Sequence, residues 1–101
     1  MAVTYMEIDT EQLHRDIQVL REQTAKAAGS LEELRSELKE LHSMWKGMAS
    51  EVFHRQAGKD CSDMEALIGR MQELAECMEY ARREYSRCEG DVIRAVEAVR
   101  V

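Results

Sequence analysis

Apolar side chains recur along this chain at alternating spacings of four and three residues, with one interruption near the middle. The first series is Leu13, Ile17, Leu20, Thr24, Ala27, Leu31, Leu34, Leu38, Leu41 and Trp45. The second series is Phe53, Ala57, Asp60, Met64, Leu67, Met71, Leu74, Met78, Ala81, Tyr85, Cys88, Val92, Ala95 and Val99. Each series has one polar lapse, Thr24 or Asp60. A mean period of 3.5 residues is typical of helices that pack against another helix, so the pattern predicts two long amphipathic helices.

The predicted fold class is all-α, an antiparallel helix-turn-helix hairpin that forms one domain over residues 1–101. We expect an N-terminal segment over 1–8, a first helix over 9–44, a turn over 45–48 and a second helix over 49–99. Asp9 is a candidate N-cap, with Gln12 closing a capping box and Ile8 and Leu13 forming a hydrophobic staple. Gly47 suits a turn that needs a left-handed residue.

Two glycines leave a second arrangement open. Gly29-Ser30 precedes Glu33, and Gly58 precedes a Ser62-Asp63-Met64-Glu65 segment. Both resemble a helix stop followed by a capping box, which would give a compact bundle of four short helices. The heptad phase passes through both sites without a slip, and an interior glycine costs only about 1 kcal/mol. Two uninterrupted helices are therefore the preferred prediction.

A two-helix hairpin buries only the seam between its helices, so association with a second hairpin into a four-helix bundle is expected. The partner would be a second copy or a related helical hairpin protein. The residues expected to form the core and the dimer interface are Leu31, Leu34, Leu38, Leu41, Phe53, Met64, Leu67, Met71, Leu74 and Met78.

Composition narrows the class of protein. With 45% hydrophobic and 34% charged residues, the chain is too apolar for a disordered polymer and too charged for a membrane protein. A net charge of −6 argues against a duplex nucleic-acid binder. Arg82, Arg83 and Arg87 alternate with Glu79, Glu84 and Glu89, which predicts a self-paired helix face. No basic and apolar leader of a secretory signal peptide precedes Asp9.

The residues that carry chemistry form no recognisable catalytic or metal-binding set. Cys77 and Cys88 would lie about 16 Å apart on one helix, too far for a disulfide, and with Cys61 they are expected to be free thiols. His14, His42 and His54 show no metal-ligand spacing. We therefore expect a non-enzymatic protein without cofactor, metal or small-molecule substrate.

The segment at the bend, residues 45–53, reads Trp-Lys-Gly-Met-Ala-Ser-Glu-Val-Phe. A chain of about 100 residues with Trp45 and Gly47 between two long amphipathic helices resembles the Trp-x-Gly family of small bacterial type VII secretion substrates, also called early-secreted-antigen-like. The resemblance covers essentially the whole chain. It implies a protein made in the cytoplasm and secreted, as a folded dimer, without a cleaved signal peptide. A membrane-associated secretion ATPase would recognise it.

The same resemblance implies an export signal of the form Tyr-x-x-x-Asp/Glu near the end of the second helix. Two matches overlap, Tyr80 with Glu84 and Tyr85 with Glu89. Tyr85 with Glu89 is preferred because Tyr85 lies on the apolar stripe, and Tyr80 with Glu84 is the fallback. In the family the signal is composite, with the Trp-x-Gly turn of one protomer beside the tyrosine segment of the other.

Three functional hypotheses follow. The first is an exported type VII substrate. The second is an intracellular targeting partner or chaperone that delivers a larger helical effector, such as a toxin. The third is a cytosolic coiled-coil adaptor with no role in secretion. Export into the medium and its dependence on Tyr85 separate the first from the third.

Overall fold

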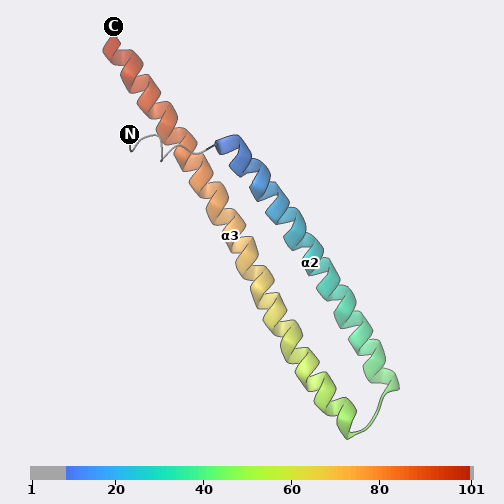
Figure 1. The fold of residues 1–101 in the computed structure, drawn as a ribbon. Helices are drawn as coiled ribbons and strands as arrows, with labels where there is room; N and C mark the ends of the chain where they lie inside the picture. Colours follow the sequence, from blue (N-terminus) through green and yellow to red (C-terminus); the bar gives the residue numbers. More distant parts are fainter. Residues whose placement is uncertain (1–8, 101) are drawn as a thin grey trace.

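The computed structural model describes residues 9–100, with side chains over 9–99. Two helices, α2 (Thr10–Met44) and α3 (Met48–Arg100), run antiparallel and are joined by residues 45–47 (Figure 1). The prediction of an all-α helical hairpin is confirmed. The segment 1–8, including Ile8 of the expected staple, lies outside the described residues.

α2 begins directly after Asp9, the predicted N-cap, but the expected return bond from the Gln12 side chain is not made. Asp9 Oδ1 accepts hydrogen bonds from the backbone N–H groups of Glu11 at 3.1 Å and Gln12 at 3.0 Å. These bonds satisfy two of the donors that a helix leaves free at its start. The Gln12 side chain does not return to Asp9. It donates to Asp16 at 2.9 Å and accepts from Arg15 at 2.9 Å, so only half of the capping box forms.

Both helices continue through the glycines that left their continuity open. α2 includes Gly29 and α3 includes Gly58 without a break. The alternative of four short helices is therefore wrong. No side chain or distant backbone atom lies within 4 Å of the position of an added Cβ at either glycine, so each is a plain interior helical position. The penalty of about 1 kcal/mol at each glycine is small beside the packing of a long seam.

The inner seam is the row of buried residues where α2 and α3 meet. On α2 it consists of Ile17, Thr24 and Leu31, seven residues apart, and Ile17 is 0% exposed. On α3 it consists of the smaller side chains Ser50, Cys61 and Ala75. The buried residues are thus large on α2, apart from Thr24, and small on α3, and small side chains let two helices approach closely.

The second helix turns its expected stripe partly away from α2. Of the ten residues assigned to core and dimer interface, Leu31 is buried, Leu38, Leu41, Met71 and Met78 are half-buried, and Leu34, Phe53, Met64, Leu67 and Leu74 are exposed. The stripe sits beside the inner seam of α3 because the small side chains of the neighbouring row permit a closer approach. These exposures fit a row of which one part packs within the hairpin and the other part was expected to lie in a dimer interface.

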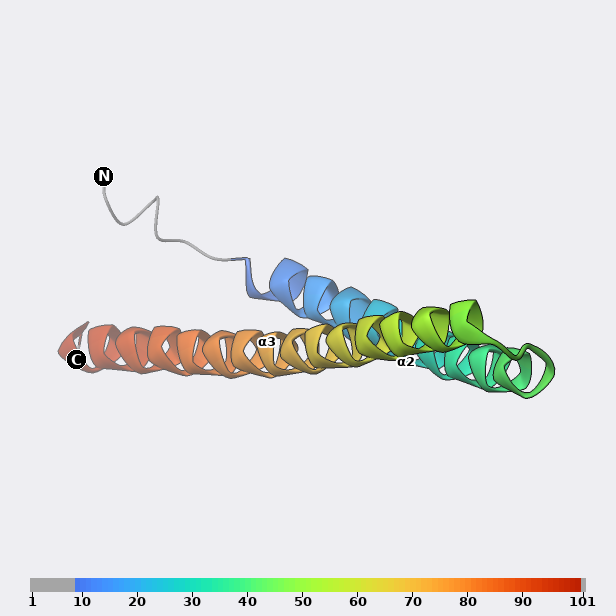
Figure 2. The ribbon, with the colours of Figure 1, turned by 90° about the horizontal axis from the view of Figure 1, so that it is seen from below.

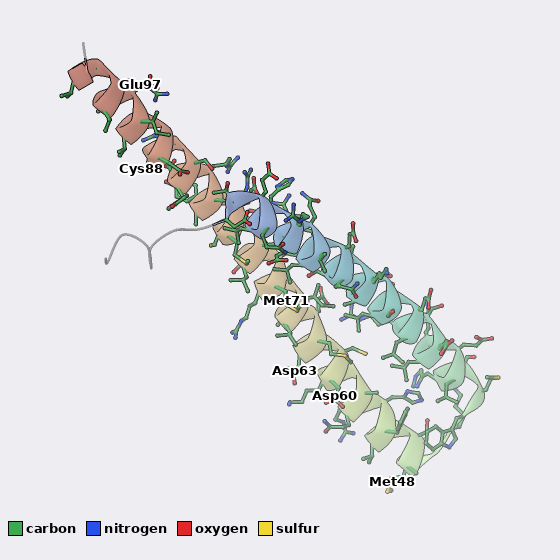
Figure 3. All side chains as sticks on the ribbon, turned by 45° about the horizontal axis from the view of Figure 1, so that its top comes forward. Met48, Asp60, Asp63, Met71, Cys88 and Glu97 are labelled. Atoms are coloured by element: carbon green, nitrogen blue, oxygen red, sulfur yellow. The ribbon has the colours of Figure 1, made fainter. Side chains whose placement is uncertain are left out.

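The helices differ in length, and α3 projects past the start of α2 (Figure 1). Cys88 and Glu97 lie on this projecting segment, while Met48 lies at the opposite end beside the turn (Figure 3). Exposed apolar residues of the projecting segment are Val92, Ile93, Val96 and Val99. This segment therefore carries an apolar surface that α2 does not cover.

Among the described residues, two pairs of oppositely charged or chargeable side chains connect α2 with α3. Arg35 Nη2 lies 2.6 Å from Glu65 Oε2, and His14 Nδ1 lies 4.0 Å from Glu79 Oε2. The hydrogen bond from Arg35 to Glu65 is the main cause of a raised pKa of Arg35. In Figure 2 the two helices cross at a shallow angle, as expected for helices packed with a heptad period.

Candidate interaction surfaces

The Trp-x-Gly segment forms a tight connection held by backbone bonds. Trp45 N–H donates to Leu41 O at 2.9 Å, and Glu51 N–H donates to Gly47 O at 3.1 Å, so one helix ends and the next begins within three residues. Gly47 has a φ of 121°, a conformation that side-chain-bearing residues rarely adopt. Ser50 Oγ donates to Trp45 O at 2.8 Å and braces the turn from inside.

Four rings, defined here as the turn cluster, pack where the turn closes: His42, Trp45, Phe53 and His54. Ring centroids lie 5.5 Å apart for Trp45 and Phe53, and 5.8 Å apart for Trp45 and His54. His42 and His54 meet edge to face at 4.5 Å, one from each helix. These separations are within the range in which aromatic pairs contribute beyond the area they bury.

His54 is the residue of this cluster that sequence reasoning missed. Its Nε2 is buried and has no hydrogen-bond partner among the described residues. Burial, and then the nearby His42, lower the pKa of His54. The apolar series runs through Asp60 rather than Cys61, so the pattern did not mark His54, which stands one heptad before Cys61.

The outer face is the apolar surface formed by Leu20, Ala27, Leu34, Leu41, Phe53, Met64, Leu67, Leu74 and Met78. Most members follow an inner-seam residue by three positions, as Leu34 follows Leu31 and Met64 follows Cys61. Three positions along a helix correspond to a rotation of about 300°, which is the same as about −60°. Each of these outer-face residues therefore points about 60° away from the inner-seam residue that it follows. Because the two helices run in opposite directions, the same rotation places both rows on one side of the hairpin.

The outer face is continuous with the apolar row of the projecting segment. Its spacing runs on from Met78 through Tyr85 to Val92 and Val99 in heptad phase. Asp60 is a polar residue in the same row and accepts a hydrogen bond from Gln56 at 2.9 Å. An exposed apolar surface of this length is uncommon on a monomer and marks a candidate protein–protein contact.

The two candidate export motifs differ in their surroundings. Tyr85 is half-buried and Glu89 is exposed, four residues on, so the two share a side of α3. Tyr80 is 61% exposed and lies off the outer face. Glu84 Oε2 lies 3.7 Å from Arg87 Nη2, whereas Glu89 makes no ion pair within the described part of the chain.

The arginines near these motifs are largely paired within α3. Arg82 holds Glu79 with two hydrogen bonds, of 2.5 Å and 3.1 Å, and Arg87 pairs with Glu84. The bonds from Arg82 are the main cause of a lowered pKa of Glu79. The expected self-paired face is thus present for two of the three arginines.

The cysteines, the possible metal ligands and the cavity beside the turn do not point to a particular reaction. Cys61 is buried, Cys77 and Cys88 are exposed, and all three are free. Over residues 9–99, no three His, Cys, Asp or Glu side chains come together as metal ligands. An open cavity of about 440 Å³ lies beside the turn cluster, between Arg35 and Lys39 of α2 and Gly58 and Ser62 of α3.

The described helices contain no stretch that is both long and apolar enough to cross a membrane.

The turn and the tyrosine motif lie toward opposite ends of one hairpin. Tyr85 comes 37 residues after Met48 along α3, which corresponds to about 55 Å at 1.5 Å per residue. A single chain therefore cannot present the two motifs as one surface.

No family model, curated protein or solved structure matches this chain.

Proposed function

We propose that this chain is a non-enzymatic protein of the Trp-x-Gly type that a type VII secretion system exports as a folded helical dimer. The observation that carries the proposal is the outer face, together with the turn at one end of it and Tyr85 toward the other. The protein would be made in the cytoplasm and leave without a cleaved signal peptide.

The outer face supports a dimer of hairpins. Leu67 and Leu74 are 58% and 53% exposed on it, although each is a side chain whose burial is worth about 2 kcal/mol. Stacking a second hairpin on this side would cover both helices at once and complete a four-helix bundle. The polar side of the hairpin would stay in water.

An antiparallel arrangement of the two hairpins supports a composite signal. It would bring the turn of one protomer, with Trp45 and Gly47, toward the segment of the other that carries Tyr85 and Glu89. The secretion ATPase would then recognise a surface that only the dimer has. Recognition of an unpaired or unfolded copy would be avoided, because the two motifs lie far apart within one chain.

Glu89 favours the second tyrosine motif over the first. Its carboxylate is exposed and makes no ion pair among the described residues, so it is available to a partner. Glu84 of the fallback motif is already close to Arg87. Tyr85 continues the outer face, which would position its ring at the edge of the dimer contact.

The test is export into the culture medium of the source cell, comparing wild type with Tyr85→Ala. We expect wild type in the medium and the variant retained inside, at equal total amounts and with equal helicity by circular dichroism. Tyr80→Ala is the matched control, because it removes an equal side chain from the same helix, and it should be exported normally.

Each other outcome has a definite meaning. Retention of Tyr80→Ala with export of Tyr85→Ala would move the signal to Tyr80 and Glu84. Export of both variants would refute a tyrosine signal in this chain. Absence of wild type from the medium would refute export and leave the adaptor hypothesis.

The exposed outer face also fits a second function, that of a targeting partner or chaperone for a larger helical effector. In that case the occupant of the face would be a helical region of the effector rather than a second copy. The purified chain would then stay monomeric or aggregate, and would form a stable complex only with the effector. A stable homodimer of the purified chain would count against this alternative.

A further inference from the structure

We propose that the contact between His42 and His54 is an acid-sensitive closure of the hairpin, holding the turn end together at neutral pH and releasing it when the His54 imidazole becomes protonated. This inference stands on the hairpin alone and does not require the proposed function.

The geometry places one imidazole from each helix against the other. The His42 and His54 ring centroids are 4.5 Å apart with an interplanar angle of 85°. His42 lies two residues before the end of α2 at Met44, and His54 lies in the second turn of α3. Their contact therefore joins the two helices directly beside the connection.

His42 is exposed and His54 is half-buried, but one nitrogen of His54 is fully enclosed, which favours a neutral His54 ring. The Nε2 atom of His54 is buried without a hydrogen-bond partner among the described residues. An unpaired nitrogen of a neutral ring is costly, but a buried and unpaired charge costs far more. Protonation of His54 would thus favour a conformation in which Nε2 reaches water.

The cavity beside the two rings offers no compensating negative charge. The cavity that both histidines line is bordered by Arg35 and Lys39 from α2 and by the Cys61 thiol from α3, and no carboxylate borders it. The connecting segment contributes Trp45, which does not titrate. Glu65, the acidic partner of Arg35 at 2.6 Å, does not line this cavity. Glu51 stands three residues before His54 on α3 and is exposed. An imidazolium turned toward the cavity would therefore meet cations rather than an acid.

The direction of the pH effect follows from these facts. The pKa of His54 is lowered by burial and then by His42, so the closed state binds fewer protons than the open one. The contact is at full strength above the ordinary histidine value near 6.5, and it weakens as the pH falls from there through the folded pKa.

Opening would be local. Trp45 and Phe53 rest on His54, with centroids at 5.8 Å and 5.2 Å, so these rings lose their support when His54 moves out. The buried seam around Ile17 and Leu31 lies far from the turn and contains no histidine. The helices would therefore remain paired there while the turn cluster loosens.

The sole tryptophan allows the proposal to be tested directly. We would follow Trp45 fluorescence and the imidazole NMR signals of the full chain from about pH 7.5 to about pH 5, a range that spans the ordinary histidine pKa. The expected results are a red shift of Trp45 emission with a midpoint below 6.5, and a His54 titration at the same midpoint. Helicity at 222 nm should change by much less than the fluorescence.

Matched variants separate this contact from other histidines. His54→Gln removes the titrating ring and should abolish the acid shift, while His42→Gln should raise the titration midpoint of His54. His14→Gln changes a histidine near the far end of the hairpin and should behave as wild type. Each variant is first required to match wild-type helicity at neutral pH.

An unchanged emission in wild type, an equal acid shift in His54→Gln, or a His54 midpoint at or above 6.5 would each overturn the proposal. The NMR titration uses the wild-type chain, so it decides the question even if a variant fails to fold.

Discussion

Thr24 and Ser50 are buried polar side chains in the hairpin, and each donates to a carbonyl of its own neighbourhood. Thr24 Oγ1 reaches Leu20 O at 2.6 Å, and Ser50 Oγ reaches Trp45 O at 2.8 Å. Neither requires a partner on the opposite helix, so a polar residue in the seam costs little here. Thr24, a lapse in the apolar pattern, is for this reason no weakness in the packing.

Replacing Gly47 or Gly58 by alanine should change the stability of the hairpin in opposite directions. Gly47→Ala places a side chain at a φ of 121°, which is expected to cost about 1–3 kcal/mol of stability. Gly58→Ala adds a methyl group to a helix interior where nothing lies within 4 Å. It should therefore raise stability by about 0.5–1 kcal/mol.

Urea unfolding followed by circular dichroism measures both changes on the same protein, with Gly58→Ala as the internal control. Equal effects of the two substitutions would contradict the conformational difference between the turn and the helix.

Within α3, a network of charges supports the helix where it meets the start of α2. Arg82 holds Glu79 by two hydrogen bonds, and His14 of α2 lies 4.0 Å from the same carboxylate. The Glu79 side chain is only 16% exposed. This is the most enclosed ion pair among the described residues, and it depends on Glu79 being ionised.

Glu79→Gln should lower the thermal midpoint at neutral pH and lose its effect in acid. The hydrogen bonds from Arg82 lower the pKa of Glu79 in the folded state. Its contribution to stability is therefore present above the unfolded value of 4.5 and disappears as the pH falls through the folded pKa.

Thermal unfolding from about pH 7 to about pH 3 tests this, with Glu84→Gln as the control. Glu84 is more exposed and its contact with Arg87 is longer, at 3.7 Å, so its loss should matter less. A Glu79→Gln effect that is independent of pH would show that the charge is not the cause.

At the level of the helices, the heptad pattern was enough to predict two long elements and the connection between them. The heptad spacing continues without a shift past Gly29 and Gly58, and both helices are unbroken there. Asp9 was also a sufficient signal for the start of α2. These features are local, and each depends on residues within a few turns of one helix.

Which row of α3 packs against α2 depends on both helices, so the pattern within one helix could not predict it. α3 offers two neighbouring rows, one of large residues such as Leu67 and Leu74 and one of small residues such as Cys61 and Ala75. Hydrophobicity alone favours the large row as the seam. Close approach between two helices favours the small row, and that preference depends on the shape of α2. The pairing of His42 with His54 has the same origin, because it arises only when the two helices are placed together.

The described hairpin carries the outer face on one side, and this asymmetry predicts where an acidic residue is tolerated. Leu74 and Val19 are both 53% exposed. Leu74 belongs to the outer face, whereas Val19 lies two positions, or about 200°, beyond the buried Ile17. If two copies stack through the outer face, Leu74→Glu buries an unpaired charge and Val19→Glu does not.

Leu74→Glu is expected to weaken association by about 3 kcal/mol or more, which is at least about a hundredfold. Sedimentation equilibrium should give the monomer mass of 11.7 kDa for this variant and twice that mass for wild type and Val19→Glu. Dimers that persist in Leu74→Glu, or dissociate equally in Val19→Glu, would place the interface elsewhere.

The proportions of the hairpin affect how it moves through water. The molecule extends over 82 × 21 × 16 Å, with a radius of gyration of 22.9 Å, whereas a compact chain of this length has about 13 Å. A rod of this kind experiences more friction than a sphere of equal mass and elutes early from a sizing column. A single chain could then be mistaken there for a pair, and only a method that weighs the particle independently of its drag can count the subunits.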